Sequence, residues 1–111
     1  MHLTSKGIEA RGREVAAGFV VFRESGAVGS SRVTASLQTH MSSVKDLRDE
    51  LIRQAVLVPQ GDAYVLSQDY VFSSPSTAAA VLLGRSANGR TEWKTREGRT
   101  LKELQEAAAG L

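Results

Sequence analysis

Mixed apolar and charged positions at the start of the chain predict strands. Residues 3–15 combine the two kinds of side chain around two glycines, and Phe19–Glu24 (FVVFRE) has the aromatic and β-branched content of a strand. We therefore expect a β-hairpin at the N-terminus, with Phe19 and Phe22 in the core. Residues 25–43 are rich in Gly, Ser and Thr, so they are predicted to form mostly loop, with room for one edge strand.

The clearest helical period lies in residues 43–57 (SVKDLRDELIRQAVL). Four apolar positions share one face of this predicted helix: Val44, Leu47, Leu51 and Ala55. Four charged positions lie away from that face: Lys45, Arg48, Asp49 and Arg53. Ser43 is expected to cap the helix, with Asp46 completing a capping box. Asp49 is expected to pair with Arg53 across one helical turn.

Aromatic and β-branched residues return in Ala63–Phe72 (AYVLSQDYVF), which predicts further strand structure. The Gln68–Asp69 interruption suits a tight turn or a bulge, so one bent strand and two short strands both remain open. Ser74 is a good helix N-cap, and Pro75 suits the first helical position because its missing N–H would have no partner there. This helix is expected to end at Gly84.

Turn chemistry dominates the last third of the chain. Asn88-Gly89 is the pair favoured by a two-residue type I′ turn, so residues 85–87 and 90–94 are predicted to form a hairpin. Trp93 would then be a strand residue that packs inward. Thr100 is expected to cap a final helix with the sequence LKELQEAAA.

The resulting order, β, β, α, β, α, β, α, predicts an α+β fold: a small, mainly antiparallel sheet with about three helices packed on it. We expect a single domain over residues 1–111, with its core within about residues 3–108. The 41% share of hydrophobic residues is typical of a globular protein, so the chain can bury a core.

Composition narrows the setting and the chemistry. The chain has no cysteine, which excludes disulfides and cysteine-ligated metal sites. No apolar run approaches the ~20 residues that span a bilayer, and residues 1–15 lack the apolar core of a signal peptide, so we expect a cytoplasmic protein without membrane contact. His2 and His40 have no spacing that pairs either with a nucleophile, and no catalytic or nucleotide-binding motif occurs. We expect no enzyme activity, no metal and no cofactor.

Net charge is only +2, but the basic residues are unevenly placed. Between residues 85 and 102, six basic residues stand against two acidic ones, an excess of four: Arg85, Arg90, Lys94, Arg96, Arg99 and Lys102 against Glu92 and Glu97. This segment is a candidate basic face for a polyanion. A solvated surface without a partner is the alternative, because each charge alone is unremarkable.

Serines at the start of the second predicted helix form another candidate. Ser73 and Ser76 flank the expected cap Ser74, and hydroxyl groups beside free N–H groups at a helix start can hold a phosphate. The alternative is that Ser74 caps the helix and the other serines face water. Trp93 could stack on a base, but a lone tryptophan in a small domain more often packs in the core.

The stretch DYVFSSPSTAAAVLLGRSANGRTEWKTREGRTLKEL resembles the signature of a small prokaryotic domain of unknown function that is often found at the carboxyl end of GIY-YIG nuclease-like proteins. It is also similar to domains associated with restriction and modification systems. KGIEARGREVAAGFVVFRESGA and LRDELIRQAVL resemble the first half of that domain, so the similarity covers Leu3–Leu104. Arg90 stands where the family pattern often has an aromatic residue, which favours an electrostatic role over stacking.

The resemblance implies recognition of DNA beside a nuclease or modification activity that other residues carry, since paired GIY and YIG strands do not occur in this sequence. We therefore expect a non-catalytic module that contacts the phosphates of nucleic acid, DNA in preference, and accompanies a nuclease or modification protein. The predicted contact residues are Ser73, Ser76, Arg85, Arg90, Lys94, Arg96 and Arg99. The alternative is a protein-interaction or dimerisation module without nucleic-acid binding.

Overall fold

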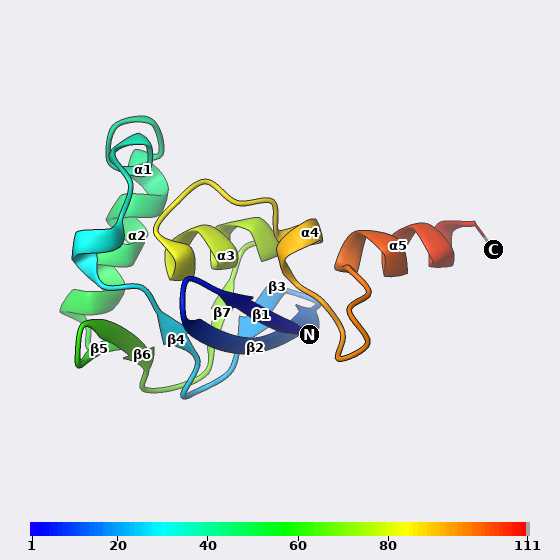
Figure 1. The fold of residues 1–111 in the computed structure, drawn as a ribbon, viewed down its shortest axis with the longest axis horizontal. Coiled ribbons are helices and arrows are strands. Elements are labelled where there is room, and N and C mark those ends of the chain that lie inside the picture. The colour runs from blue at the N-terminus through cyan, green and yellow to red at the C-terminus, as the bar shows by residue number, and fades with distance from the viewer. Residues whose placement is uncertain (111) are drawn as a thin grey trace.

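A four-stranded antiparallel sheet forms one layer of the molecule in the computed structural model, which describes residues 1–110. Its strands, in spatial order, are β1 (His2–Ser5), β2 (Ile8–Val15), β3 (Gly18–Val21) and β7 (Tyr70–Phe72) (Figure 1). Lys6 and Gly7 turn the chain between β1 and β2 at positive φ angles of 53° and 80°. The predicted N-terminal hairpin is confirmed. Leu111, the last residue of the predicted domain, lies outside the described residues.

A second antiparallel sheet has the strand order β4-β6-β5. Its strands are β4 (Gly26–Ala27), β5 (Leu57–Gln60) and β6 (Ala63–Leu66). The segment Ala63–Phe72 therefore forms two short strands that belong to different sheets, which decides between the two predicted possibilities. Asp69 lies between them, and its Oδ1 accepts a hydrogen bond from the backbone N–H of Arg23 at 2.7 Å. The Gln68–Asp69 interruption thus marks the change of sheet.

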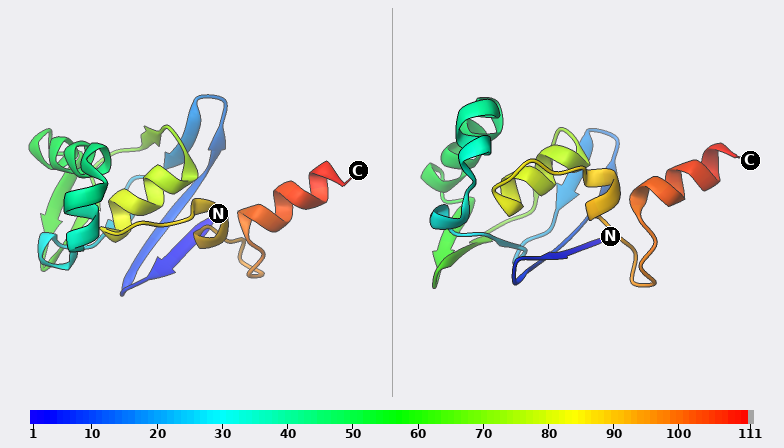
Figure 2. Two further views of the ribbon diagram at one scale, coloured as in Figure 1. Left: turned by 90° about the horizontal axis from the view of Figure 1, so that it is seen from above. Right: turned by 45° about the horizontal axis from the view of Figure 1, so that its top comes forward.

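Helices surround the two sheets unevenly (Figures 1 and 2). They are η1 (Ser30–Arg32), α1 (Ala35–His40), α2 (Ser42–Arg53), α3 (Pro75–Leu83), α4 (Gly89–Glu92) and α5 (Leu101–Ala109). α3 lies across one face of the four-stranded sheet, α1 and α2 lie toward the second sheet, and α5 projects from the opposite end. The fold is α+β with antiparallel sheets and three substantial helices, α2, α3 and α5, which confirms the predicted class.

The central helix α3 begins and ends as predicted. Ser74 Oγ accepts a hydrogen bond from the N–H of Thr77 at 3.1 Å, Pro75 occupies the first turn, and Gly84 ends the helix at φ 65°. Every residue of Ala78–Leu83 is buried. A helix that is apolar all round must pack on several sides. α3 accordingly contacts α2 as well as β3, β4 and β7.

The core between α3 and the four-stranded sheet includes Trp93. Its side chain is fully buried, its ring centroid lies 4.6 Å from that of Phe19, and its Nε1 donates a hydrogen bond to the Pro75 carbonyl at 3.1 Å. The core assignments of Phe19 and Trp93 are confirmed. The core assignment of Phe22 is wrong, because this residue is only half-buried and lies outside the main cluster of core residues.

The hairpin predicted at Asn88-Gly89 does not form. Asn88 has a φ of −94° and caps α4, since its Oδ1 accepts a hydrogen bond from the N–H of Arg90 at 3.0 Å. Gly89 is required for packing rather than for positive φ, because a Cβ there would lie 2.2 Å from the Pro75 carbonyl carbon. Trp93 consequently follows a short helix and does not lie in one of the named strands.

The prediction of mostly loop for residues 25–43 is also wrong, because this segment contains η1 and α1. The one edge strand that the prediction allowed is present as β4. Thr34 caps α1 by accepting a hydrogen bond from the N–H of Leu37 at 3.2 Å, and Leu37 is fully buried. α2 begins at Ser42, its N-cap position is Met41 and it has no side-chain cap, so the capping role predicted for Ser43 is not observed. It ends at Arg53 because Ala55 adopts a φ of 59°, which removes Ala55 from the helix.

Arg48 was predicted to face solvent and is instead 2% exposed. Its Nη1 donates a hydrogen bond to the Val81 carbonyl at 2.7 Å, its Nη2 donates to the Val28 carbonyl, and its guanidinium lies 5.6 Å from the centroid of the Tyr64 ring. Burial lowers the pKa of Arg48. The predicted ion pair between Asp49 and Arg53 is replaced by pairs of Lys45 with Asp49 and of Arg53 with Glu50.

Candidate nucleic-acid interface

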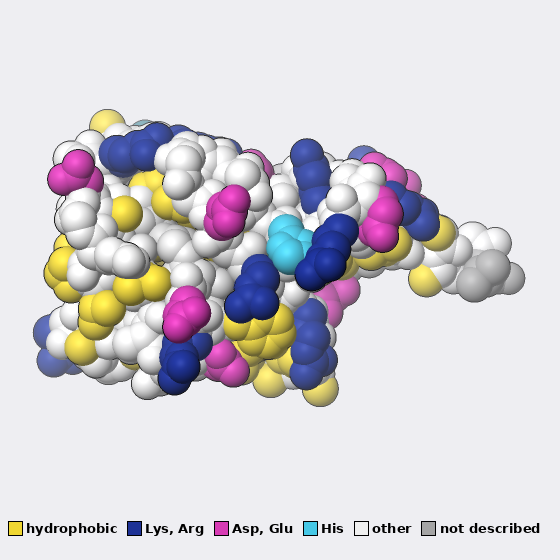
Figure 3. All heavy atoms as spheres, turned by 60° about the horizontal axis from the view of Figure 1, so that its bottom comes forward, with side chains coloured by type: hydrophobic (Ala, Val, Ile, Leu, Met, Phe, Trp, Pro, Cys, Tyr) yellow, Lys and Arg dark blue, Asp and Glu magenta, His cyan; other side chains and the backbone are white. Residues whose placement is uncertain are grey.

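The four-stranded sheet has one face that no helix covers. In β2 the side chains alternate: Ile8, Ala10 and Gly12 are buried, whereas Glu9, Arg11 and Arg13 are exposed. Alternate residues of a strand point to opposite faces of the sheet. Because Ile8 and Ala10 belong to the core, the second set lies on the opposite, outer face of the sheet, which is open to solvent (Figure 3).

Strand pairing brings three basic side chains into one row across this outer face. His2 pairs with Arg11 of β2 on one side and with Lys94 on the other. The second pairing has two backbone hydrogen bonds, from His2 N–H to Lys94 O at 2.6 Å and from Lys94 N–H to His2 O at 2.8 Å. Directly opposed residues of antiparallel strands share a face. We call Lys94, His2 and Arg11 the basic row.

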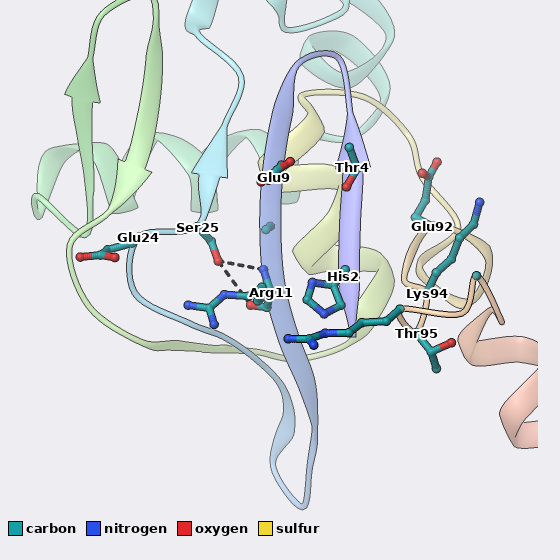
Figure 4. Close-up of a pocket in the computed structure, with 12 residues that line it drawn as sticks. His2, Thr4, Glu9, Arg11, Glu24, Ser25, Glu92, Lys94 and Thr95 are labelled. Atoms are coloured by element: carbon teal, nitrogen blue, oxygen red, sulfur yellow. Dashed lines mark hydrogen bonds between the residues drawn. The ribbon is translucent and has the colours of Figure 1, made fainter.

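A groove of about 690 Å³ runs along the basic row (Figure 4). The segment after α4 forms one wall and contributes Arg96, and Glu24 and Ser25 form the other. Ser25 is 4% exposed, and its Oγ both accepts a hydrogen bond from the Arg11 N–H (3.0 Å) and donates one to the Arg11 carbonyl (3.3 Å). These two bonds fix the backbone of β2 beneath the groove.

The charge of the outer face changes along the strands. Glu9, which pairs with Thr4, lies between the basic row and the turn that joins β1 and β2. Arg13 lies on the other side of the basic row, further from that turn. Glu92 of the groove is held by Arg85 through an ion pair of 3.0 Å. Basic residues therefore concentrate away from the turn, in the basic row and at Arg13, while Glu24 adds one exposed carboxylate to the groove wall.

A hydrophobic patch adjoins the positive end of the face. Val20 pairs with Arg13 on one side and with Val71 on the other, and the Phe22 N–H donates a hydrogen bond to the Arg11 carbonyl at 2.9 Å. Val71 is 45% exposed and Phe22 is half-buried, whereas Val20 between them is only 8% exposed. Figure 3 shows a compact hydrophobic area bordered by Lys and Arg side chains on this face. We call Val20, Phe22 and Val71 the outer patch.

A second group of cations lies near the turn between β1 and β2. Lys6 Nζ donates to the Leu83 carbonyl at 3.5 Å, and Arg32 Nη1 donates to the Lys6 carbonyl at 2.5 Å. Burial lowers the pKa of Lys6, and the positive charges of Arg85 and Arg32 lower it further. These hydrogen bonds lead to backbone carbonyls, including one at the C-terminal end of α3, where positive charge stabilises a helix. The positions of Lys6 and Arg32 are therefore explained by these structural hydrogen bonds, without a ligand.

The predicted contact residues divide among three places. Lys94 and Arg96 line the groove, and Arg85 stands at its margin in the ion pair with Glu92. Ser73 and Ser76 lie at the start of α3, where Ser76 Oγ accepts a hydrogen bond from the Gly89 N–H at 2.9 Å. That bond uses Ser76 to hold α4 against α3.

Arg90 and Arg99, the remaining predicted contacts, are engaged with α5. Arg90 Nε donates a hydrogen bond to Gln105 Oε1 at 2.7 Å, and Arg99 lies 3.9 Å from Glu103 in an exposed ion pair. The α4–α5 side and the groove are therefore separate groups of basic residues. The structure does not gather all seven predicted residues into one site.

The contact residues predicted from the sequence do not include His2, Arg11 and Arg13, which share the outer face with Lys94. The signal was present in the alternation of Ile8–Arg13, where every second residue is charged. The pairing of His2 with Lys94 was not predictable from local patterns, because it joins residues 92 positions apart.

Other kinds of site find little support in residues 1–110. No group of three or more His, Asp or Glu side chains could hold a metal ion there. None of the helices in this described part combines the length and apolar character needed to cross a membrane.

The molecule is thus a small α+β protein with one uncovered sheet face that carries a basic row and a hydrophobic patch. Residues 1–105 match the family model of a domain of unknown function, DUF4357, and the chain belongs to this family. Comparisons with curated proteins and with solved structures gave no match.

Proposed function

We propose that the protein is a non-catalytic module that binds nucleic acid through the outer face of its four-stranded sheet. The observation that carries the proposal is the basic row, with Arg13 and Arg96 beside it, on a face that no helix covers. Cations arranged in this way contact phosphates and fix the position of a nucleic-acid backbone.

The state of these cations supports the proposal. Within residues 1–110, no ion pair joins Arg11, Arg13, Lys94 or Arg96 to a carboxylate, and all four side chains are exposed. Binding to phosphates releases counterions from the nucleic acid, which drives association at low salt. The ion pairs of Arg85 and Arg99 would have to be broken or shared before those residues could contribute fully.

DNA is the favoured nucleic acid, and a nuclease or modification enzyme is the favoured companion, because the sequence resembles domains found beside such activities. In this proposal the module acts in the cytoplasm and holds nucleic acid while another polypeptide or domain performs the chemistry. Protein interaction without nucleic acid remains the competing function, favoured by the exposed Val71.

The first test compares two triple variants that remove equal charge. Arg11→Ala/Lys94→Ala/Arg96→Ala is expected to weaken binding of labelled DNA at low salt by tenfold or more, and to reduce the slope of log affinity against log salt by about three, one for each phosphate contact. Lys45→Ala/Arg53→Ala/Lys102→Ala has the same net charge but leaves the outer face intact, so it should bind within about twofold of the unmodified protein. Fluorescence anisotropy measures both.

Two results would contradict the proposal. Equal losses in the two triple variants would mean that overall charge, and not this face, determines binding. Absence of binding to single- or double-stranded DNA and to RNA at low salt would favour the alternative function, protein interaction. Pull-down and sedimentation experiments would then test that alternative. A third variant, Arg85→Ala/Arg90→Ala/Arg99→Ala, tests the basic residues predicted from sequence that lie outside the groove.

A further inference from the structure

The outer patch is the feature of the binding face that phosphate contact does not explain. Val71 is the most conspicuous of its residues, since this valine on the edge strand β7 is 45% exposed to water. Val20 and Phe22 belong to the same face, where Phe22 is half-buried and Val20 is 8% exposed. A surface that only binds phosphates gains nothing from apolar side chains at its centre.

We infer that the natural ligand of this face is an unpaired nucleic-acid strand whose bases stack on the outer patch while its phosphates contact the basic row. This inference rests on the proposed function and specifies the form of nucleic acid. An unpaired strand offers both kinds of surface that the face could bind, since each nucleotide has a flat apolar base and a charged phosphate.

The position of Phe22 fits a stacking role. Phe22 lies beside the basic row, because its N–H donates to the carbonyl of Arg11 at 2.9 Å. It follows the buried Val21 at the end of β3, so the alternation of the strand directs it to the outer face. Its half-burial leaves part of the side chain accessible to a ligand. A base over Phe22 would therefore have its phosphate within reach of Arg11.

The remaining outer patch continues this surface across the sheet. Val20 lies between Arg13 and Val71 in the next row and is only 8% exposed, so the accessible apolar surface of this row belongs to Val71. A four-stranded sheet with accessible aromatic and apolar residues has room for about two or three stacked bases. The arrangement thus suits a short run of unpaired nucleotides that crosses the strands.

A duplex fits the same face less well. Base faces inside a double helix are already stacked, so a protein reads base edges through a helix or ribbon that enters a groove. The outer face presents a sheet surface, and the views of Figures 1 and 2 show no helix projecting from it. Against a duplex, the outer patch would lie near charged phosphates and lose water without gaining apolar contacts.

The test compares a single strand with a duplex in the presence and absence of the aromatic ring. The probes are a labelled oligothymidylate, a labelled oligouridylate and a blunt-ended DNA duplex of the same length. We expect tighter binding of the single strands than of the duplex. Phe22→Leu should weaken single-strand binding by about fivefold or more and leave duplex binding unchanged. Phe22→Tyr, which keeps a stacking ring, should retain the affinity.

A second measurement uses the unmodified protein and so does not depend on the folding of a variant. In methyl NMR spectra, ring currents of stacked bases should move the Val71 methyl signals on addition of oligothymidylate. The methyl signals of Val28, which is fully buried, should stay in place.

The outcomes separate this inference from the proposed function. Equal affinity for single strand and duplex, unchanged single-strand affinity in Phe22→Leu, or unmoved Val71 methyl signals would overturn the inference. If the Arg11/Lys94/Arg96 triple variant still lost binding in such a case, phosphate binding by this face would stand. Failure of all three probes to bind would overturn both.

Discussion

Among single residues, Arg48 is notable because its charged side chain is buried. A guanidinium with 2% exposure satisfies the carbonyls of Val28 and Val81 and lies over the ring of Tyr64. These contacts join α2, the segment after β4 and α3. Hydrogen bonds to a charged donor are stronger than neutral ones, and the carbonyl oxygens are otherwise buried away from water. Arg48 therefore stabilises the packing of α2 against α3 and the second sheet.

Replacing Arg48 by methionine should destabilise the protein. Arg48→Met keeps much of the apolar stem but leaves two carbonyl oxygens without their donor, so the free energy of unfolding should fall by about 2–4 kcal/mol. Urea denaturation followed by circular dichroism measures the change. Arg53→Met is the matched control on the same helix, since Arg53 has a 71% exposed side chain and should cost no more than about 0.5 kcal/mol. Equal losses would contradict the role assigned to Arg48.

Hydrogen bonds between residues close in the sequence could be predicted, and hydrogen bonds between distant residues could not. Ser74 and Thr100 cap helices as expected, because each accepts a hydrogen bond from the N–H three residues further on. Arg48 occupies a charged position in an amphipathic pattern, and nothing nearby in the sequence indicates that its partners lie 20 and 33 residues away. Its burial follows from tertiary packing alone.

At the scale of elements, α4 shows how packing overrides turn propensity. Asn88-Gly89 has the composition of a hairpin turn, yet the pair begins a short helix that rests on the start of α3. Gly89 is buried against the backbone of Pro75, and its N–H donates a hydrogen bond to Ser76 Oγ. Trp93, directly after α4, donates a hydrogen bond from Nε1 to the Pro75 carbonyl oxygen. The position of α4 in turn directs Lys94 toward β1.

The substitution Gly89→Ala tests this account of α4. A Cβ at residue 89 would lie 2.2 Å from backbone of Pro75, so α4 and α3 must separate and the protein should lose about 1–3 kcal/mol of stability. Gly110→Ala is the control, because its nearest neighbour would be at an ordinary 3.4 Å. Thermal unfolding of the two variants distinguishes them. An unfolding temperature of Gly89→Ala equal to that of the unmodified protein would contradict the close contact of α4 with Pro75.

Elements with strong local signals were foreseen and those held by distant contacts were not. The first hairpin and α3 have clear strand, cap and glycine signals. α1 has one buried residue, Leu37, so its amphipathic period is too short to stand out in a Ser- and Thr-rich segment. The bridge between His2 and Lys94, which completes the candidate site, depends on where α4 directs the chain.

For the whole molecule, the local arrangement of the charges matters more than their sum. A net charge of +2 gives little general attraction to nucleic acid, so binding must depend on the local arrangement of basic residues. The outer face provides such an arrangement next to an apolar patch, while most cations elsewhere are engaged in ion pairs or in hydrogen bonds to other groups. The fold thus leaves one face available for a polyanionic partner.

NMR chemical-shift mapping of the labelled protein with oligothymidylate at low salt locates the nucleic-acid contact directly. Binding by the outer face should give the largest amide shifts at His2, Arg11, Phe22 and Lys94 and leave α2 unaffected. Shifts concentrated at Ser73, Arg90 and Arg99 would instead place the contact on the α3–α5 side and contradict the outer face as the binding surface. An absence of shifts throughout would contradict nucleic-acid binding itself.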